Sequence, residues 1–261
     1  MLKKLVLSSL AVFAAALTLP AQNISFDFDI AEQWTAGDPV NSGSGILAQS
    51  SFVMQDVAAD PALPDNPSGL HAYSAGNFQN AVFFTPNTDT FDVGDSITIE
   101  ASLALADRSA FTGEKNFARI GLRTSYTNGA PTVGIDLTAN ALWATKISEI
   151  GGTEKTNVGS TDDLFHTYTT VITKTAVENT FEMSASRDGG DTISYSIVNS
   201  ALYAASNAYA AINTRAGPTT GGILMDSFSV STTSAVPEPS TYASIFGLIA
   251  LAFVVSRRKR D

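Results

Sequence analysis

The stretch SITIEASLAL, from Ser96 to Leu105, alternates polar and apolar residues along most of its length. Successive side chains of a β-strand point to opposite faces of the sheet, so this period of two predicts a strand with one buried face. The same pattern appears in ISFDFDI, from Ile24 to Ile30, where the phenylalanines share one face and the aspartates share the other. Both stretches contain Ser and Ile, with Thr in the first and Phe in the second, and these residue types suit a pleated surface buried on one side.

Similar short runs recur along the chain, and turn-forming residues separate them, as in Asn128-Gly129, Gly151-Gly152 and DGGD from Asp188 to Asp191. The further predicted strands are residues 80–85, 117–126, 132–138, 141–148, 165–173, 180–187, 192–198, 209–213 and 223–231. Only residues 199–211 leave room for a helical turn. About a dozen short strands without intervening amphipathic helices predict an all-β fold, an antiparallel β-sandwich.

Three stretches resemble strands of the concanavalin-like and laminin-G-like jelly rolls. DFD at Asp27–Asp29 resembles their opening strand, and GILMDSFSV at Gly222–Val230 resembles their closing strand. The run from Phe165 to Val171, with residues 180–187 and the turn Asp188-Gly189, resembles a late hairpin in which tryptophan is more usual than Phe165. The resemblance implies a jelly-roll sandwich for residues 22–235.

Such jelly rolls sometimes hold a structural Ca²⁺ between their first and last strands. Asp27, Asp29 and Asp226 would supply the carboxylate oxygens if those two strands pair, because Ca²⁺ prefers oxygen ligands. The alternative is that these acids are simply solvated, since the sequence holds no D-x-D-x-D-G loop. No other cofactor is expected.

The first 21 residues, MLKKLVLSSLAVFAAALTLPA, have the layout of a secretory signal peptide. Lys3 and Lys4 form a positive start, an apolar run follows, and Pro20-Ala21 offers a small-residue cleavage site. This predicts export through the Sec translocon. The alternative is an uncleaved N-terminal anchor.

The last 26 residues, VPEPSTYASIFGLIALAFVVSRRKRD at 236–261, resemble the PEP-CTERM sorting signal that bacterial exosortases are thought to recognise and process. The resemblance places recognition at Pro237, Glu238 and Pro239. Residues 240–256 are then expected to form a short transmembrane helix. A basic cluster follows it and should keep the C-terminal end of the helix on the cytoplasmic side: Arg257, Arg258, Lys259 and Arg260. We therefore expect an inner-membrane precursor that is passed by an exosortase-type enzyme to the cell surface or the extracellular matrix.

Composition excludes several functions. The chain carries a formal charge of −10, and both terminal segments are net positive, so residues 22–235 are more acidic still and nucleic-acid binding is not expected. The chain has no cysteine, which excludes thiolate metal sites and cysteine nucleophiles. Its two histidines, His71 and His166, form no zinc-binding pattern.

No catalytic residue is predicted. Asp27 and Asp29 alternate as paired acids do in sandwich glycosidases, but the wet face of an ordinary edge strand explains them better. The residues that bind a ligand are unknown, although five aromatic residues are candidates for stacking on a sugar: Trp34, Trp143, Tyr73, Tyr126 and Tyr168. The sequence favours a structural or adhesive protein of the cell envelope, with a carbohydrate-binding module and a glycan-active hydrolase or lyase as alternatives.

Overall fold

The computed structural model shows a β-sandwich within a compact unit that spans Ala21–Thr233. It describes residues 22–28, 47–50, 53–57, 69–74, 79–84, 91–105, 113–124, 131–139, 145–162, 164–205, 208–214 and 222–233. In this described part, no helix is both long and apolar enough to span a bilayer. The predicted signal peptide, 1–21, and the predicted sorting signal, 236–261, lie outside the described residues and stay predictions.

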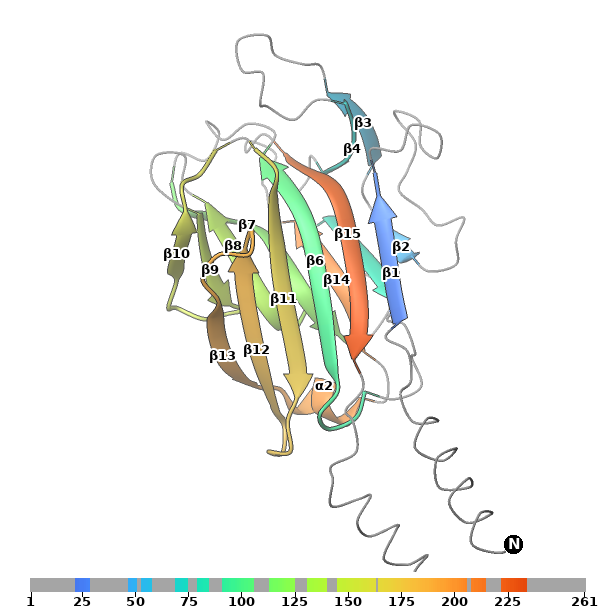
Figure 1. The fold of residues 1–261 in the computed structure, drawn as a ribbon, viewed down its shortest axis with the longest axis vertical. Coiled ribbons are helices and arrows are strands. Elements are labelled where there is room, and N and C mark those ends of the chain that lie inside the picture. Colours follow the sequence, from blue (N-terminus) through green and yellow to red (C-terminus); the bar gives the residue numbers. More distant parts are fainter. Residues whose placement is uncertain are drawn as a thin grey trace, which may run out of the picture. The chain divides into compact units, whose positions relative to one another are not determined.

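The first sheet has eight strands among the described residues, and every recorded pairing in it is antiparallel (Figure 1). Seven follow the order β13-β12-β11-β6-β15-β4-β3, and β1 also pairs with β15. Their bounds are β1 Gln22–Asp27, β3 Val53–Val57, β4 Gly69–Ser74, β6 Ser96–Leu105, β11 His166–Lys174, β12 Thr180–Arg187, β13 Ile193–Val198 and β15 Ile223–Thr233.

The second sheet lies behind the first in Figure 1 and has seven strands in the described part of the chain, in the order β10-β9-β8-β7-β14-β5-β2. Their bounds are β2 Leu47–Ser50, β5 Gln79–Phe84, β7 Lys115–Arg123, β8 Val133–Ala139, β9 Thr145–Glu149, β10 Thr156–Gly159 and β14 Tyr209–Thr214. All recorded pairings are antiparallel here too.

The core lies between the two sheets. On β6 the burial pattern alternates as the sequence predicts, with Ile97 and Ile99 buried and Glu100 exposed. Phe117 of β7 meets Tyr168 of β11 edge to face across the core, with ring centroids 6.3 Å apart. Burying apolar side chains from both sheets removes them from water, which is the main force that holds a sandwich together.

The predicted all-β antiparallel sandwich is confirmed, and so are most of its strands. Residues 96–105 form a strand with the predicted bounds, and residues 180–187 do the same. The helical turn expected within residues 199–211 is α2, Ser200–Ala204, and the Asn199 side chain caps it by accepting a hydrogen bond from Leu202 N at 2.9 Å. Four short strands, β2, β3, β4 and β10, were not predicted.

Two glycines face each other where β7 and β8 pair. Gly121 is the register partner of Gly134, which has a φ of 151°. A Cβ atom on Gly121 would lie 2.1 Å from the carbonyl oxygen of Val133 and 2.7 Å from the Cα of Gly134. Backbone atoms cannot move aside as a flexible side chain can, so this strand pair requires glycine.

Candidate functional site

The β12–β13 hairpin ends in a tight turn with two residues in the left-handed region. Asp188 has a φ of 53° and Gly189 a φ of 68°, and Gly190 N donates a hydrogen bond to Arg187 O at 2.9 Å. These are the features of a type I′ turn, whose twist matches that of a hairpin and which favours Asp and Gly. The turn fixes the place of the Asp188 carboxylate beside the start of β11.

His166, the first residue of β11, lies between two carboxylates. Its Nδ1 is 2.6 Å from Oδ2 of Asp188, and its Nε2 is 2.7 Å from Oδ1 of Asp162. The two carboxylates are themselves positioned by the backbone, because Thr167 N donates to Asp188 at 2.9 Å and Leu164 N donates to Asp162 at 3.1 Å. The imidazole therefore joins two loops that are distant in sequence.

Arg187 completes this cluster from the inner face of β12. Its side chain is only 5% exposed, and a buried charge needs charged or hydrogen-bonding partners. Its Nη1 donates to Ser160 O at 2.8 Å, its Nε lies 3.5 Å from Asp188, and its Nη2 lies 3.6 Å from Asp162 and contacts Nε2 of His166. We call Asp162, His166, Arg187 and Asp188 the rim cluster.

The contact at Nδ1 of His166 is a hydrogen bond to Asp188 in both charge states of the ring, whereas Nε2 serves either Asp162 or Arg187 but not both. A charged imidazole donates from both nitrogens, which satisfies Asp162 and Asp188 together. A neutral imidazole with its proton on Nδ1 still donates to Asp188 and accepts from the Arg187 guanidinium at Nε2, but it no longer donates to Asp162. Arg187 keeps partners in both states, so its guanidinium is held in one place.

Tyr168, the next inward-facing residue of β11 after His166, lies in the hydrophobic core. Tyr168 is the register partner of Arg187 and is 2% exposed. Burial raises the pKa of its phenol well above the ordinary value of 10.0, because the phenolate would lose its hydration. The expectation that Tyr168 is available to stack on a sugar is therefore wrong, since it packs against Phe117 inside the sandwich.

A pocket of about 180 Å³ opens beside the rim cluster. It lies between the edge strand β10 of the second sheet and the β12–β13 hairpin of the first. Its lining consists of Thr156, Asn157, Val158, Arg187, Gly190, Asp191 and Ile193. Its volume is below the ~300–1,000 Å³ usual for drug-sized ligands, so it suits one small polar unit. We call this feature the rim pocket.

The structure bears on part of the predicted calcium site. β1 and β15 do pair, with Asp27 opposite Ser227 and Phe28 N donating to Asp226 O at 2.8 Å. Asp226, however, has a carboxylate oxygen 3.4 Å from Nδ1 of His71, and Asp29 lies outside the described residues. Across the described ranges no group of three or more His, Cys, Asp or Glu residues is arranged to hold a metal ion. The calcium site stays a prediction.

The other predicted site residues fall where the structure gives no side-chain geometry. Trp34, Trp143 and Tyr126 lie outside the described residues, as do Pro237–Pro239 and Arg257–Arg260, and the side chain of Tyr73 on β4 is not described. The sequence reasoning missed Arg187 and Asn157. A signal for Arg187 was present: on β12 it shares the inner face with Phe181, Met183 and Ala185, where a charge needs buried partners.

No protein-family profile matches this chain, and no characterised protein matches it by sequence. Solved structures match its fold. Peanut lectin with a bound 9-residue peptide aligns over 82% of this chain and 99% of its own, with 11% identity and a TM-score of 0.50. The winged bean acidic lectin with methyl-α-D-galactose aligns over 81% and 99% (8% identity, TM-score 0.48), and a carbohydrate esterase of bacteriophage phi24B aligns over 82% and 100% (12% identity, TM-score 0.47). The likeness to peanut lectin shows the fold alone, a lectin-like β-sandwich.

Proposed function

We propose that this chain is an exported, non-catalytic β-sandwich that binds carbohydrate, with one sugar unit in the rim pocket. The observation that carries the proposal is a buried arginine, held by the rim cluster, in the lining of a small polar pocket. The likeness of the fold to lectins supports the class of ligand and carries no residue-level argument.

The lining of the rim pocket has the mixture of groups that a sugar ring needs. Sugar hydroxyls both donate and accept, and the residues that line this space include one with a hydroxyl (Thr156), one with an amide (Asn157), one with a carboxylate (Asp191) and one with a guanidinium (Arg187). Val158 and Ile193 add apolar surface for the C–H groups of the ring. A carboxylate and a guanidinium also form stronger, charge-assisted hydrogen bonds than neutral groups do.

The rim cluster holds the Arg187 side chain, which is part of the pocket lining, in a fixed position. A ligand that binds to a mobile arginine must first order that side chain, at a cost of about 0.5–1.5 kcal/mol. Arg187 is already ordered by Ser160 O, Asp162, His166 and Asp188. We therefore assign Asp162, His166 and Asp188 a positioning role.

The rim cluster does not support the glycan-active alternative. Two-carboxylate glycosidases need both acids to face a shared cleft where the substrate lies. Here both Asp162 and Asp188 face the same imidazole, which occupies the space between them. The geometry of the rim cluster favours a role in positioning the residues of a binding site over a role in hydrolysis.

The second part of the proposal concerns where the protein acts. The tail at 236–261, with Pro237-Glu238-Pro239, an apolar run and four cations, supports sorting by an exosortase-type enzyme to the cell surface or extracellular matrix. A carbohydrate-binding domain suits that location, because polysaccharides are abundant outside the cell. The tail and the pocket are independent observations, and each has its own test.

The binding proposal is tested by probing a glycan array with the full chain. Asp191→Asn and Asn157→Asp are the informative variants, since both keep the side-chain shape and Asn157→Asp keeps the acceptor for Gly159 N, which lies 2.9 Å from Asn157 Oδ1. We expect both to weaken the strongest array signal, with Glu154→Gln, an exposed acid outside the pocket lining, as the control. Absence of any glycan signal, or equal signals from all four proteins, would overturn the proposal.

A further inference from the structure

Where the structure describes its side chains, the outward face of the first sheet is rich in hydroxyl groups. Period-two alternation puts one residue in two on this face, and its members are exposed or half-buried. The hydroxyl-bearing members are Ser25 on β1; Ser227, Ser229, Ser231 and Thr233 on β15; Ser96, Thr98 and Ser102 on β6; Thr167, Thr169 and Thr173 on β11; Ser184 and Ser186 on β12; and Ser194 and Ser196 on β13. We call this surface the hydroxyl face.

The register of the strands arranges these side chains in rows. One row crosses from Ser25 through Ser229, Glu100 and Thr169 to Ser186, each residue being the direct partner of the next. Neighbouring members of a row are separated by the strand spacing of about 4.8 Å, and successive rows by about 6.8 Å along the strands. The hydroxyl face is therefore a regular array of hydrogen-bond donors and acceptors.

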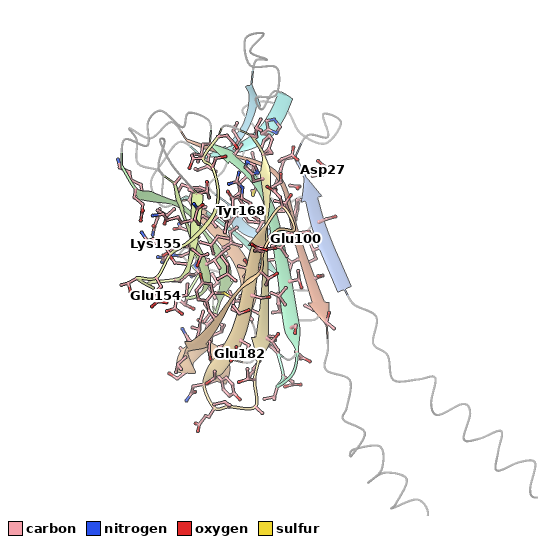
Figure 2. All side chains as sticks on the ribbon, turned by 60° about the vertical axis from the view of Figure 1, so that its left-hand side comes forward. Asp27, Glu100, Glu154, Lys155, Tyr168 and Glu182 are labelled. Carbon is pink, nitrogen blue, oxygen red and sulfur yellow. The ribbon has the colours of Figure 1, made fainter. Side chains whose placement is uncertain are left out.

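The charges on the hydroxyl face are all negative at the described strand positions. They are Asp27, Glu100 and Glu182, and all three side chains are exposed. Figure 2 shows them along a diagonal across the first sheet, on three different strands. The cations of these strands point the other way: Lys174 and Arg187 are buried on the inner face.

Glu100, the middle acid of the diagonal, is held by its neighbours in the row. Thr169 Oγ1 donates to its Oε1 at 3.3 Å, and Ser229 Oγ donates to its Oε2 at 3.4 Å. Each carboxylate oxygen has further acceptor capacity, so the group remains able to take an additional donor from outside. The carboxylate thus stands between two strands with its position already set.

We propose that the hydroxyl face binds a polysaccharide that carries positively charged amino groups, an amino-sugar polymer. Its hydroxyls would exchange hydrogen bonds with the Ser and Thr rows, and its ammonium groups would pair with Asp27, Glu100 and Glu182. Charge complementarity selects this occupant. An acidic polymer would be repelled, and a second copy of the same face would meet like charges; among the described exposed or half-buried members, the apolar ones are Val171 and Val198.

This surface is separate from the rim pocket and does not depend on it. No outward member of the hydroxyl face lines that pocket. Aromatic residues, which commonly hold neutral sugar rings by stacking, do not occur among the described outward positions. Binding at the hydroxyl face should for this reason depend on charge and fall with added salt.

The test measures binding of the full chain to three soluble probes: deacetylated chitin, its N-acetylated oligomer and polygalacturonate. The double variant Glu100→Gln/Glu182→Gln removes two charges from the hydroxyl face. The control Glu154→Gln/Glu178→Gln removes two exposed charges elsewhere. We expect the first double variant to bind deacetylated chitin about three- to tenfold more weakly at low salt, and the control to bind as the parent does.

Several outcomes would overturn the proposal. They are equal losses in the two double variants, equally tight binding of the N-acetylated oligomer, preference for polygalacturonate, or no binding of deacetylated chitin. Asp191→Asn separates the two surfaces. If it abolishes binding of deacetylated chitin while Glu100→Gln/Glu182→Gln does not, the rim pocket is the site and the hydroxyl face is not.

Discussion

The imidazole Nδ1 of His166 and the carboxylate Oδ2 of Asp188 lie 2.6 Å apart, although 22 positions separate the two residues in sequence. The contact joins the first residue of β11 to the turn that follows β12. Because Asp188 also lies 3.5 Å from Nε of Arg187, the same contact helps to fix the guanidinium beside the rim pocket. The rim pocket and the hairpin beside it are therefore one structural unit.

Replacing His166 by Phe should destabilise the protein. The phenyl ring has a similar size but no ring nitrogen. Asp162, Asp188 and Arg187 therefore each lose their contact with the imidazole. We expect a loss of about 1–3 kcal/mol in the free energy of unfolding, measured in urea. Thr167→Ala, at the exposed next position of β11, should change it by less than about 0.5 kcal/mol. Equal stabilities for the parent and His166→Phe would show that the rim cluster is not a supporting element.

Gly121→Ala should disrupt the pairing of β7 with β8. The new methyl group would meet backbone atoms of β8 at 2.1 Å, so the strands must separate locally. We expect a loss above about 2 kcal/mol, seen as a lower thermal midpoint. Gly113→Ala is the matched control, because a Cβ there would have nothing within 4 Å. A Gly121→Ala variant as stable as the control would contradict the close approach of these strands.

The stabilising effect of Glu114 should depend on pH. Hydrogen bonds from Lys146 at 2.6 Å and Lys155 at 2.5 Å lower the pKa of Glu114 below its ordinary value of 4.5. A carboxyl group whose pKa is lower in the folded than in the unfolded protein stabilises the fold when the pH is above its unfolded-state pKa. That stabilisation is lost as the pH falls through its folded-state pKa. The group is surface-exposed, so Glu114→Gln should cost about 0.2–1 kcal/mol at neutral pH.

The check on Glu114 is a pair of urea titrations, at neutral pH and well below 4.5. The difference between the parent and Glu114→Gln should vanish in the acidic series. Glu154→Gln, a nearby exposed acid, serves as the control. A difference that is the same at both pH values would mean that ionisation of Glu114 is not its cause.

Two kinds of change in the tail should have separable effects. Changing Pro237 and Pro239 to Ala should leave membrane insertion intact and impair processing, because an extended segment suits a protease active site and Pro favours one. Changing Arg257–Arg260 to Gln should instead impair orientation, since cations resist crossing the bilayer. Fractionation and the size of the mature product distinguish the two. A mature surface protein that keeps its tail in a host with the sorting enzyme would contradict processing.

The fold was predictable where one face of a strand is buried and the other is wet. Residues 96–105 and 180–187 alternate strictly enough for their bounds to be read from sequence. β8 and β14 are buried along their whole length, so their burial carries no period of two, although β-branched and apolar residues still marked them. Three of the four missed strands, β2, β3 and β10, have four or five residues, too few to show a period.

The candidate site was less predictable, because strand register creates it. Asp162, His166 and Asp188 each fall in stretches that the sequence marks as turn or strand, but nothing local says that they meet. Their meeting follows from the pairing of β11 with β12, which places Tyr168 opposite Arg187. Asn157 belongs to an edge strand that pairs only with β9 in the described part of the chain, so its place in the rim pocket depends on non-local contacts.

The most direct test of the central claim is an NMR titration of the isotope-labelled full chain with the methyl glycosides of glucose, galactose, mannose and N-acetylglucosamine. If the rim pocket binds a sugar unit, at least one glycoside should shift the backbone amides of Thr156, Asn157, Gly190 and Asp191 in a saturable manner, and Asp191→Asn should weaken that response. If no glycoside shifts these amides, or if the saturable shifts lie elsewhere and survive Asp191→Asn, the rim pocket is not a carbohydrate site.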